Sequence, residues 1–191
     1  MAKKIPRIAI AYDFDGTLAP GNMQQHSFIP KLGVDSGTFW EEVKSIAKEN
    51  DMSEILSYMH LMLKKANEKG VPITKKAFID HGKGMPLFAG VEDYFKKINE
   101  YARSKGLNIE HYIISSGLRE ILKGTAISKE FEMIFASAYM FNANDVAEWP
   151  ALAIDYTTKT QFLFRINKGI KNAWDNESVN KYMPNDARPM P

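Results

Sequence analysis

The chain has 191 residues, of which 45% are hydrophobic and 12% are aromatic. This length and composition suit one α/β domain with an insertion and argue against a disordered chain. The formal net charge of +2 gives no reason to expect a nucleic-acid-binding stripe or a membrane-surface patch. The lack of cysteine excludes disulfides, thiolate catalysis and cysteine-based zinc sites. No apolar run approaches the ~20 residues of a transmembrane helix, so we expect a cytoplasmic protein.

Residues 8–12 form a continuous apolar run, and two aspartates follow it. Such a run predicts a strand of a parallel sheet, buried on both faces. Residues 13–17 read Asp-Phe-Asp-Gly-Thr, which places Asp13 and Asp15 at the carboxyl end of this strand. Ligands bind at the carboxyl ends of strands in open parallel sheets. We interpret the pair as a catalytic site; the structural alternative is a polar Asp-Gly turn that only ends the strand.

The pentad at the end of an apolar strand resembles the first motif of the haloacid dehalogenase-like (HAD) superfamily, most of whose members are magnesium-dependent phosphatases. The resemblance spans most of the chain and points to the phosphoserine phosphatase-like branch with a helical cap. It implies that Asp13 is the nucleophile and Asp15 the general acid and base, both at a Mg²⁺ site. It also implies an α/β fold with a Rossmann-like parallel sheet, helices on both faces and an inserted helical cap.

The spacing of the two aspartates has a chemical consequence of its own. Two carboxylates this close cannot both ionise cheaply, so one pKa should rise unless a cation lies between them. A divalent ion would keep Asp13 anionic and nucleophilic. Asp15, in its protonated form, is suited to donate a proton to a leaving alcohol and later to take one from water.

The segment after the first strand reads as an insertion. Glycines and prolines in residues 19–35 indicate a flexible connection. Three amphipathic helical patterns follow, the last with Thr74 as a plausible N-cap, at residues 39–46, 55–63 and 74–82. The Met and Tyr side chains of this insertion either line a substrate pocket or form only its own core. We expect a cap domain over residues 19–85 and a core domain over residues 1–18 and 86–191.

The remaining elements indicate a return to the parallel sheet. An amphipathic helix over residues 91–102 ends near Gly106, and a strand over residues 112–117 follows. Strand, helix and strand in this order predict a parallel crossover, so the two strand ends should be neighbours. We then expect a helix at 118–123, a strand at 133–136, a β-hairpin from 139–141 and 151–154, and a last helix capped by Thr157 or Thr158.

Three residues match the family's second and third motifs and predict a phosphate site. Ser115, through its hydroxyl, and Ser116, through its amide, could donate to phosphoryl oxygens where a helix begins. Lys159 follows the strand-to-helix boundary at 154–158, and its charge would stabilise the phosphoryl oxygens and Asp13. The structural alternatives are helix-capping serines and a solvated lysine. The rival lysines are Lys123, Lys168 and Lys171.

The family's fourth motif, a paired-acid element on a later strand that completes magnesium coordination, is missing. The acids after Lys159 are Asp175, Glu177 and Asp186, and none follows an apolar run. Residues 185–191 resemble the lead-in to a further strand. We therefore expect a C-terminally truncated form of a longer phosphatase, incomplete at this end of the fold, with weak Mg²⁺ affinity and low turnover.

These observations predict a phosphatase that hydrolyses a small phosphorylated metabolite through an aspartyl-phosphate, because a cap excludes bulk polymers. Dehalogenation is disfavoured, since a departing halide needs no proton and the family's dehalogenases lack the second aspartate. One alternative is a non-catalytic phosphometabolite-binding or regulatory protein of the same fold. Another is a phosphomutase. We expect no nucleic-acid or membrane partner, and the substrate and the oligomeric state stay open.

Overall fold

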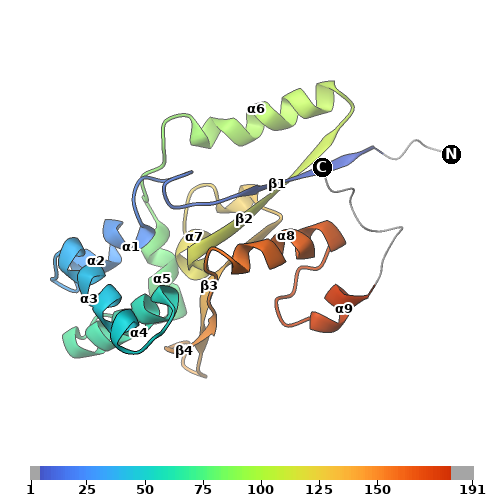
Figure 1. Cartoon of the computed structure of the whole chain (residues 1–191). Coiled ribbons are helices and arrows are strands. Elements are labelled where there is room, and N and C mark those ends of the chain that lie inside the picture. The colour runs from blue at the N-terminus through green and yellow to red at the C-terminus, as the bar shows by residue number, and fades with distance from the viewer. Residues whose placement is uncertain (1–4, 182–191) are drawn as a thin grey trace.

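The computed structural model describes residues 5–181, and these form a four-stranded sheet in the order β1-β2-β3-β4 (Figure 1). The first three strands run parallel, and β4 pairs with β3 in the antiparallel direction. The fold is thus the α/β, Rossmann-like architecture that the sequence predicts, with a mixed sheet. The strands are β1 (Arg7–Tyr12), β2 (Asn108–Leu118), β3 (Met133–Phe141) and β4 (Ala147–Leu152).

Helices cover both sides of this sheet. In Figure 1, α6 (Val91–Ser104) and α8 (Thr158–Lys168) lie on opposite sides of β1 and β2. Between β2 and β3 lie α7 (Arg119–Lys123) and a 3₁₀ turn (Ser128–Glu130), and α9 (Asn176–Asn180) follows α8. The other five helices gather beyond the carboxyl ends of the strands: α1 (Met23–His26), α2 (Phe28–Lys31), α3 (Ser36–Glu49), α4 (Glu54–Lys69) and α5 (Lys75–Gly82). Within residues 5–181, no helix combines the length and apolar character needed to cross a bilayer.

The parallel crossover between the first two strands is confirmed. Strand β1 pairs with β2 in a register that sets Tyr12 opposite Ile113. Helix α6, the last of the helices between the two strands, packs beside them and buries Phe95 completely. The residues that follow Tyr12 therefore emerge at the same edge of the sheet as those that follow Ile113, which brings the two predicted motifs together.

The three predicted helices of the insertion are present as α3, α4 and α5. Helix α3 buries Phe39 and Val43 on one face, as its periodicity requires. Helix α5 begins where the sequence indicates, because the Thr74 hydroxyl accepts a hydrogen bond from the Ala77 amide at 3.1 Å.

Two local expectations were wrong. Residues 19–35 are not an open connection but fold into α1 and α2, because Met23, Phe28 and Ile29 lie between the glycines and prolines and become buried. Strand β1 is not buried on both faces, and Ile8 keeps 42% of its surface exposed. The reason is its position: within the described residues β1 pairs only with β2 and forms an edge of the sheet.

The inserted helices share a hydrophobic core with the sheet. One buried cluster joins Phe39 and Met59 of the insertion to Ile113 and Ile121 of the sheet side. Tyr139, in β3, donates its hydroxyl to the Met59 carbonyl of α4 at 2.7 Å. The predicted division into a core domain (1–18 and 86–191) and a cap domain (19–85) stays a prediction, with continuous packing between the two parts.

Candidate active site

An ion pair joins the end of β1 to the first turn of α8. Lys159 donates from Nζ to Asp13 Oδ2 at 2.6 Å. The Asp13 side chain is 42% exposed, so an attacking oxygen remains accessible from solvent. The second oxygen, Oδ1, accepts from the Phe14 amide at 2.8 Å. The two partners are 146 residues apart in the sequence, so the sheet topology creates this contact.

The rival lysines lie elsewhere. Lys168 donates to the carbonyl groups of Val179 and Lys181, and Lys171 pairs with Glu132. Partial burial lowers the pKa of Lys123, which no hydrogen bond or ion pair joins to Asp13. Among the described lysines, the structure therefore brings Lys159 to the aspartates.

Asp15 has a different environment from Asp13. Its Oδ1 accepts from the Met23 amide at the start of α1, at 3.0 Å. Burial raises the pKa of Asp15 to about 7; the negative charge of Asp13 adds to the rise, whereas the Met23 amide and Lys159 oppose it. One carboxyl group thus has a raised pKa, as the spacing predicts, but burial contributes more to the rise than the neighbouring carboxylate does.

The predicted phosphate-binding segment follows a bulge in β2. The register between β2 and β3 shifts between Ser115 and Leu118. Ser115 is fully buried, and its Oγ accepts from the Gly117 amide at 3.0 Å. Ser116 and Gly117 line the adjacent cavity. Ser115 therefore lies beneath the cavity wall in the ligand-free protein, and its direct contact with phosphate stays a prediction.

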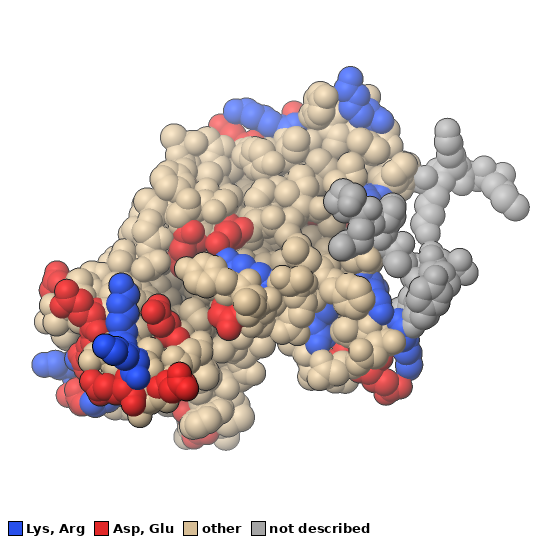
Figure 2. Space-filling model, in the orientation of Figure 1, with Lys and Arg blue, Asp and Glu red and all other residues tan. Residues whose placement is uncertain are grey.

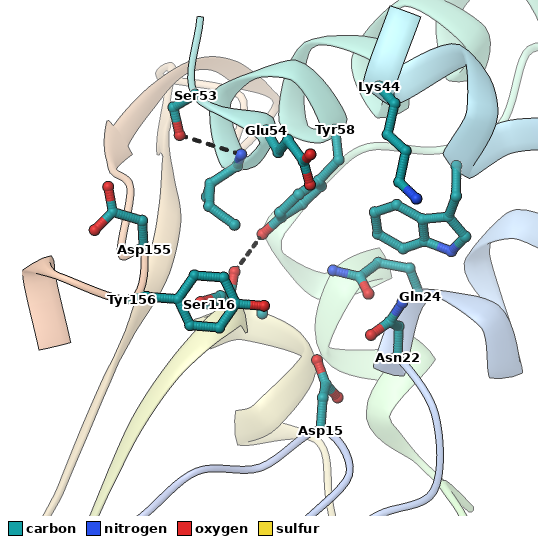
Figure 3. Close-up of a pocket in the computed structure, with 13 residues that line it drawn as sticks. Asp15, Asn22, Gln24, Lys44, Ser53, Glu54, Tyr58, Ser116, Asp155 and Tyr156 are labelled. Atoms are coloured by element: carbon teal, nitrogen blue, oxygen red, sulfur yellow. Dashed lines mark hydrogen bonds between the residues drawn. The ribbon is translucent and has the colours of Figure 1, made fainter. Parts of the chain in front are cut away.

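A cavity of about 550 Å³ lies between the inserted helices and the strand ends. In Figure 3, Asp15 and Ser116 face it from the sheet side, and Lys44 and Glu54 face it from the helices. Two buried polar atoms in its wall lack a partner in the described structure, Trp40 Nε1 and Gln24 Oε1. Buried polar groups are usually hydrogen-bonded, so these two atoms are candidates for contact with a ligand or an ordered water. The other lining residues are Asn22, Ser53, Ile55, Tyr58, Gly117, Asp155 and Tyr156.

Asp155, whose role the sequence did not indicate, fixes the start of α8. Its Oδ1 accepts from the Thr158 amide at 2.8 Å and from the hydroxyls of Thr157 and Thr158. The helix is thus capped by the Asp155 carboxylate rather than by a threonine side chain, which corrects the sequence-based prediction. These hydrogen bonds lower the pKa of Asp155 to about 2, so the cap is ionised at neutral pH. The cap orients the turn that carries Lys159.

The acidic side chains fit a magnesium ion only in part. Within residues 5–181, no three acidic or histidine side chains form a group able to hold a metal. Asp13 would supply a carboxylate oxygen and Asp15 its backbone carbonyl, and Mg²⁺ commonly binds through one or two carboxylates together with substrate phosphates. The pair fits an ion that the substrate helps to hold. Asp186, one of the acids considered for the fourth motif, lies outside the described residues.

The face of the molecule drawn in Figure 2 has no extended patch of one charge. Figure 2 shows Lys and Arg interspersed with Asp and Glu on the face drawn, consistent with the formal net charge of +2. This face therefore has no large patch of one charge that would attract a charged ligand from a distance.

Comparisons with solved structures define the class of fold. The chain matches a HAD family hydrolase from Salmonella enterica subsp. enterica serovar Typhi with a TM-score of 0.60 and 18% identity, over 87% of this chain and 54% of that one. It matches a probable phosphoserine phosphatase from Vibrio cholerae with a TM-score of 0.58 and 12% identity, over 86% and 48%. The chain therefore has the fold of the HAD-like hydrolases. It spans about half the length of these two solved structures.

Sequence comparisons add one relative. The chain is 29% identical over 208 residues to an uncharacterized protein of Borreliella burgdorferi (strain ATCC 35210 / DSM 4680 / CIP 102532 / B31), covering 96% of this chain and 71% of that protein. No protein-family model matches the chain.

Proposed function

We propose that this protein hydrolyses small, polar phosphomonoesters through an aspartyl-phosphate on Asp13. One observation carries the proposal: Lys159 forms an ion pair with Asp13 at the end of β1, while burial raises the pKa of Asp15, two residues away, to about 7. A two-step transfer needs a carboxylate nucleophile and, beside it, an acid that is still protonated near neutral pH. The fold shared with two hydrolases supports the same reading.

In the first step, an Asp13 carboxylate oxygen attacks phosphorus and the bond to the leaving oxygen breaks. Asp15 gives its proton to that oxygen, so a neutral alcohol leaves. Lys159 stabilises the charge on the transferring phosphoryl oxygens, together with donors from the Ser115–Gly117 segment.

In the second step, Asp15, now a carboxylate, takes a proton from a water molecule that attacks phosphorus. The phosphorus–Asp13 bond breaks, inorganic phosphate leaves, and both side chains return to their starting protonation states. The partial burial of Asp15 favours this recovery of the proton.

The activity should depend on pH through Asp15. Its pKa of about 7 lies above the ordinary value of 3.8, so the acid form persists to neutral pH and disappears above it. We expect kcat/KM for an alkyl phosphate to fall about tenfold per pH unit at alkaline pH, which a pH–rate profile would measure. In Asp15→Asn this limb should vanish, and an aryl phosphate with an acidic leaving group should retain more activity than the alkyl ester. An unchanged profile in the variant would assign the titration to another group.

Magnesium belongs to this proposal as a cofactor. When bound, it would supply positive charge against the phosphoryl oxygens and the Asp13 carboxylate. Because Asp13 and Asp15 are the described acids in position, we expect binding that is weak without a phosphate ligand. Chelation with EDTA should abolish phosphate release, and excess MgCl₂ should restore it. Full turnover after exhaustive chelation would remove magnesium from the mechanism.

The substrate class follows from the cavity. Its volume of about 550 Å³ falls within the ~300–1,000 Å³ typical of small-molecule sites. The unpaired Trp40 Nε1 and Gln24 Oε1 favour a leaving group with both an acceptor and a donor. The direct test is phosphate release from a panel of phosphorylated small metabolites. Failure with every member, under conditions in which the protein is folded, would contradict the proposed function.

A binding or regulatory protein of the same fold is the second candidate, favoured by the lack of a third metal-binding acid among residues 5–181. Such a protein would bind a phosphorylated ligand without releasing phosphate. A phosphomutase would instead return the phosphoryl group to another hydroxyl, so analysis of the products from a phosphosugar separates it from a hydrolase.

A further inference from the structure

One peptide unit of the phosphate-binding segment is held at both ends. Tyr58, in α4, is 3% exposed and donates its hydroxyl to the Ser116 carbonyl at 2.7 Å (Figure 3). At the other side of the same peptide, the Gly117 amide donates to Ser115 Oγ at 3.0 Å. A planar trans peptide whose oxygen and hydrogen are both bonded has its orientation fixed.

Regular strand pairing does not fix the orientation of the Ser116–Gly117 peptide. Pairing between β2 and β3 is irregular between Ser115 and Leu118, so the peptide lies in a bulge. Bulges interrupt the ladder and redirect side chains, often beside active sites. Here the orientation depends on two side chains, one of them from the inserted helices.

The same segment lies against the proposed acid. A Cβ atom built on Gly117 would stand 3.2 Å from Asp15 Oδ2 and 2.0 Å from Met23 Cε. A rotation of the Ser116–Gly117 peptide would therefore disturb the wall of the site next to Asp15. Small displacements of this kind reduce rates strongly, because donors act on the transition state only when they are already in place.

We propose that Tyr58 is a positioning residue for the reaction: its hydroxyl fixes the Ser116–Gly117 peptide and so couples helix α4 to the phosphate-binding end of β2. The inference rests on the proposed function for its turnover measurement. Tyr58 acts through the peptide, and the phenol needs no change of protonation, since burial raises its pKa above the ordinary value.

The chain offers a matched control. Tyr139 is 2% exposed and also donates its hydroxyl to a backbone carbonyl, that of Met59, at 2.7 Å. Tyr58→Phe and Tyr139→Phe thus each remove a hydroxyl that donates to a backbone carbonyl, from two side chains that are almost fully buried. The Tyr58 hydroxyl also interacts with the side chains of Ser137 and Gln24, so the stability of both variants is measured beside their rates. Only the bond from Tyr58 reaches the phosphate-binding segment.

With p-nitrophenyl phosphate as substrate, we expect Tyr58→Phe to lower kcat about 10- to 100-fold while KM changes less than about threefold. Tyr139→Phe should keep kcat within about threefold of the parent. Equal kcat values in the two variants would overturn the role of Tyr58.

A second measurement separates this inference from the proposed function. If the parent protein hydrolyses no phosphomonoester, the proposed function fails, and calorimetry with inorganic phosphate then decides the role of Tyr58. Binding about tenfold weaker in Tyr58→Phe than in Tyr139→Phe would support it, as a loss of about 1.4 kcal/mol. Equal affinities would overturn it.

Discussion

Replacing the proposed nucleophile should nearly abolish turnover: we expect Asp13→Asn to release phosphate roughly 10⁴- to 10⁶-fold more slowly than the parent protein. An amide oxygen is a poor nucleophile and cannot form the aspartyl-phosphate. Lys159 would also lose the anion that it contacts at 2.6 Å. Phosphate release under saturating substrate measures the effect, and acid-quenched mass spectrometry of the parent should find the phosphoryl group on Asp13.

A control variant with the same Asp-to-Asn change separates the loss of the proposed nucleophile from the loss of one negative charge. Asp93→Asn removes an exposed carboxylate from α6, where it forms a loose pair with Lys97 at 3.8 Å. This variant should keep the parental rate. Turnover by Asp13→Asn at a comparable rate, with no covalent phosphate in the parent, would exclude the mechanism. Retained ligand binding without any turnover in the parent would favour the binding protein instead.

The largest stability effect is expected where α5 meets α7. A Cβ atom on Gly124 would stand 1.9 Å from the Ile79 carbonyl oxygen, and one on Gly82 would stand 2.0 Å from the Ile121 carbonyl oxygen. Both obstacles are backbone atoms, so a side chain cannot be accommodated by a rotamer change. We expect Gly124→Ala to lower the free energy of unfolding by about 3 kcal/mol, the upper end for overpacking. In thermal unfolding this corresponds to about 6–12 °C for a chain of this size.

Gly37→Ala is the matched control for this prediction. Gly37 lies in the first turn of α3, and the nearest obstacle to a Cβ atom is a side-chain atom, Asp35 Oδ2, at 3.0 Å. Because alanine favours helix over glycine by about 1 kcal/mol, the control should be near neutral or slightly stabilised. An unchanged unfolding midpoint in Gly124→Ala would mean that α5 and α7 do not pack as closely as described.

The sequence predicted those parts of the candidate site whose position follows from their place directly after a strand or before a helix. Asp13 and Asp15 follow an apolar strand directly, and parallel strands end at one edge of a sheet, so their position near Ser115 required only the crossover rule. Lys159 was predicted from its place after a strand-to-helix boundary, together with the family resemblance. The periodic helices α3, α4 and α5 were predicted for the same reason: each is long enough to show a repeat.

Short elements and pocket residues could not be predicted this way. Helices α1 and α2 have four residues each, too few to show a helical period. The glycines and prolines around them indicated a flexible connection instead. Tyr58 lies on a helix face whose apolar spacing suits a core and a cavity wall equally well. The hydrogen bond from Tyr58 to Ser116 joins residues 58 positions apart, so no local pattern indicates it.

By itself, the sequence determined which side chains are proposed to carry the chemistry and the order of the main strands and helices, because both depend on residue type and short-range spacing. The tertiary structure alone decided the electrostatics. Burial in the packed chain raises the pKa of Asp15 to about 7, and α8 folds back on the sheet so that Lys159 forms an ion pair with Asp13. Burial and charge proximity are properties of the packed chain, and contacts across more than a hundred residues create them.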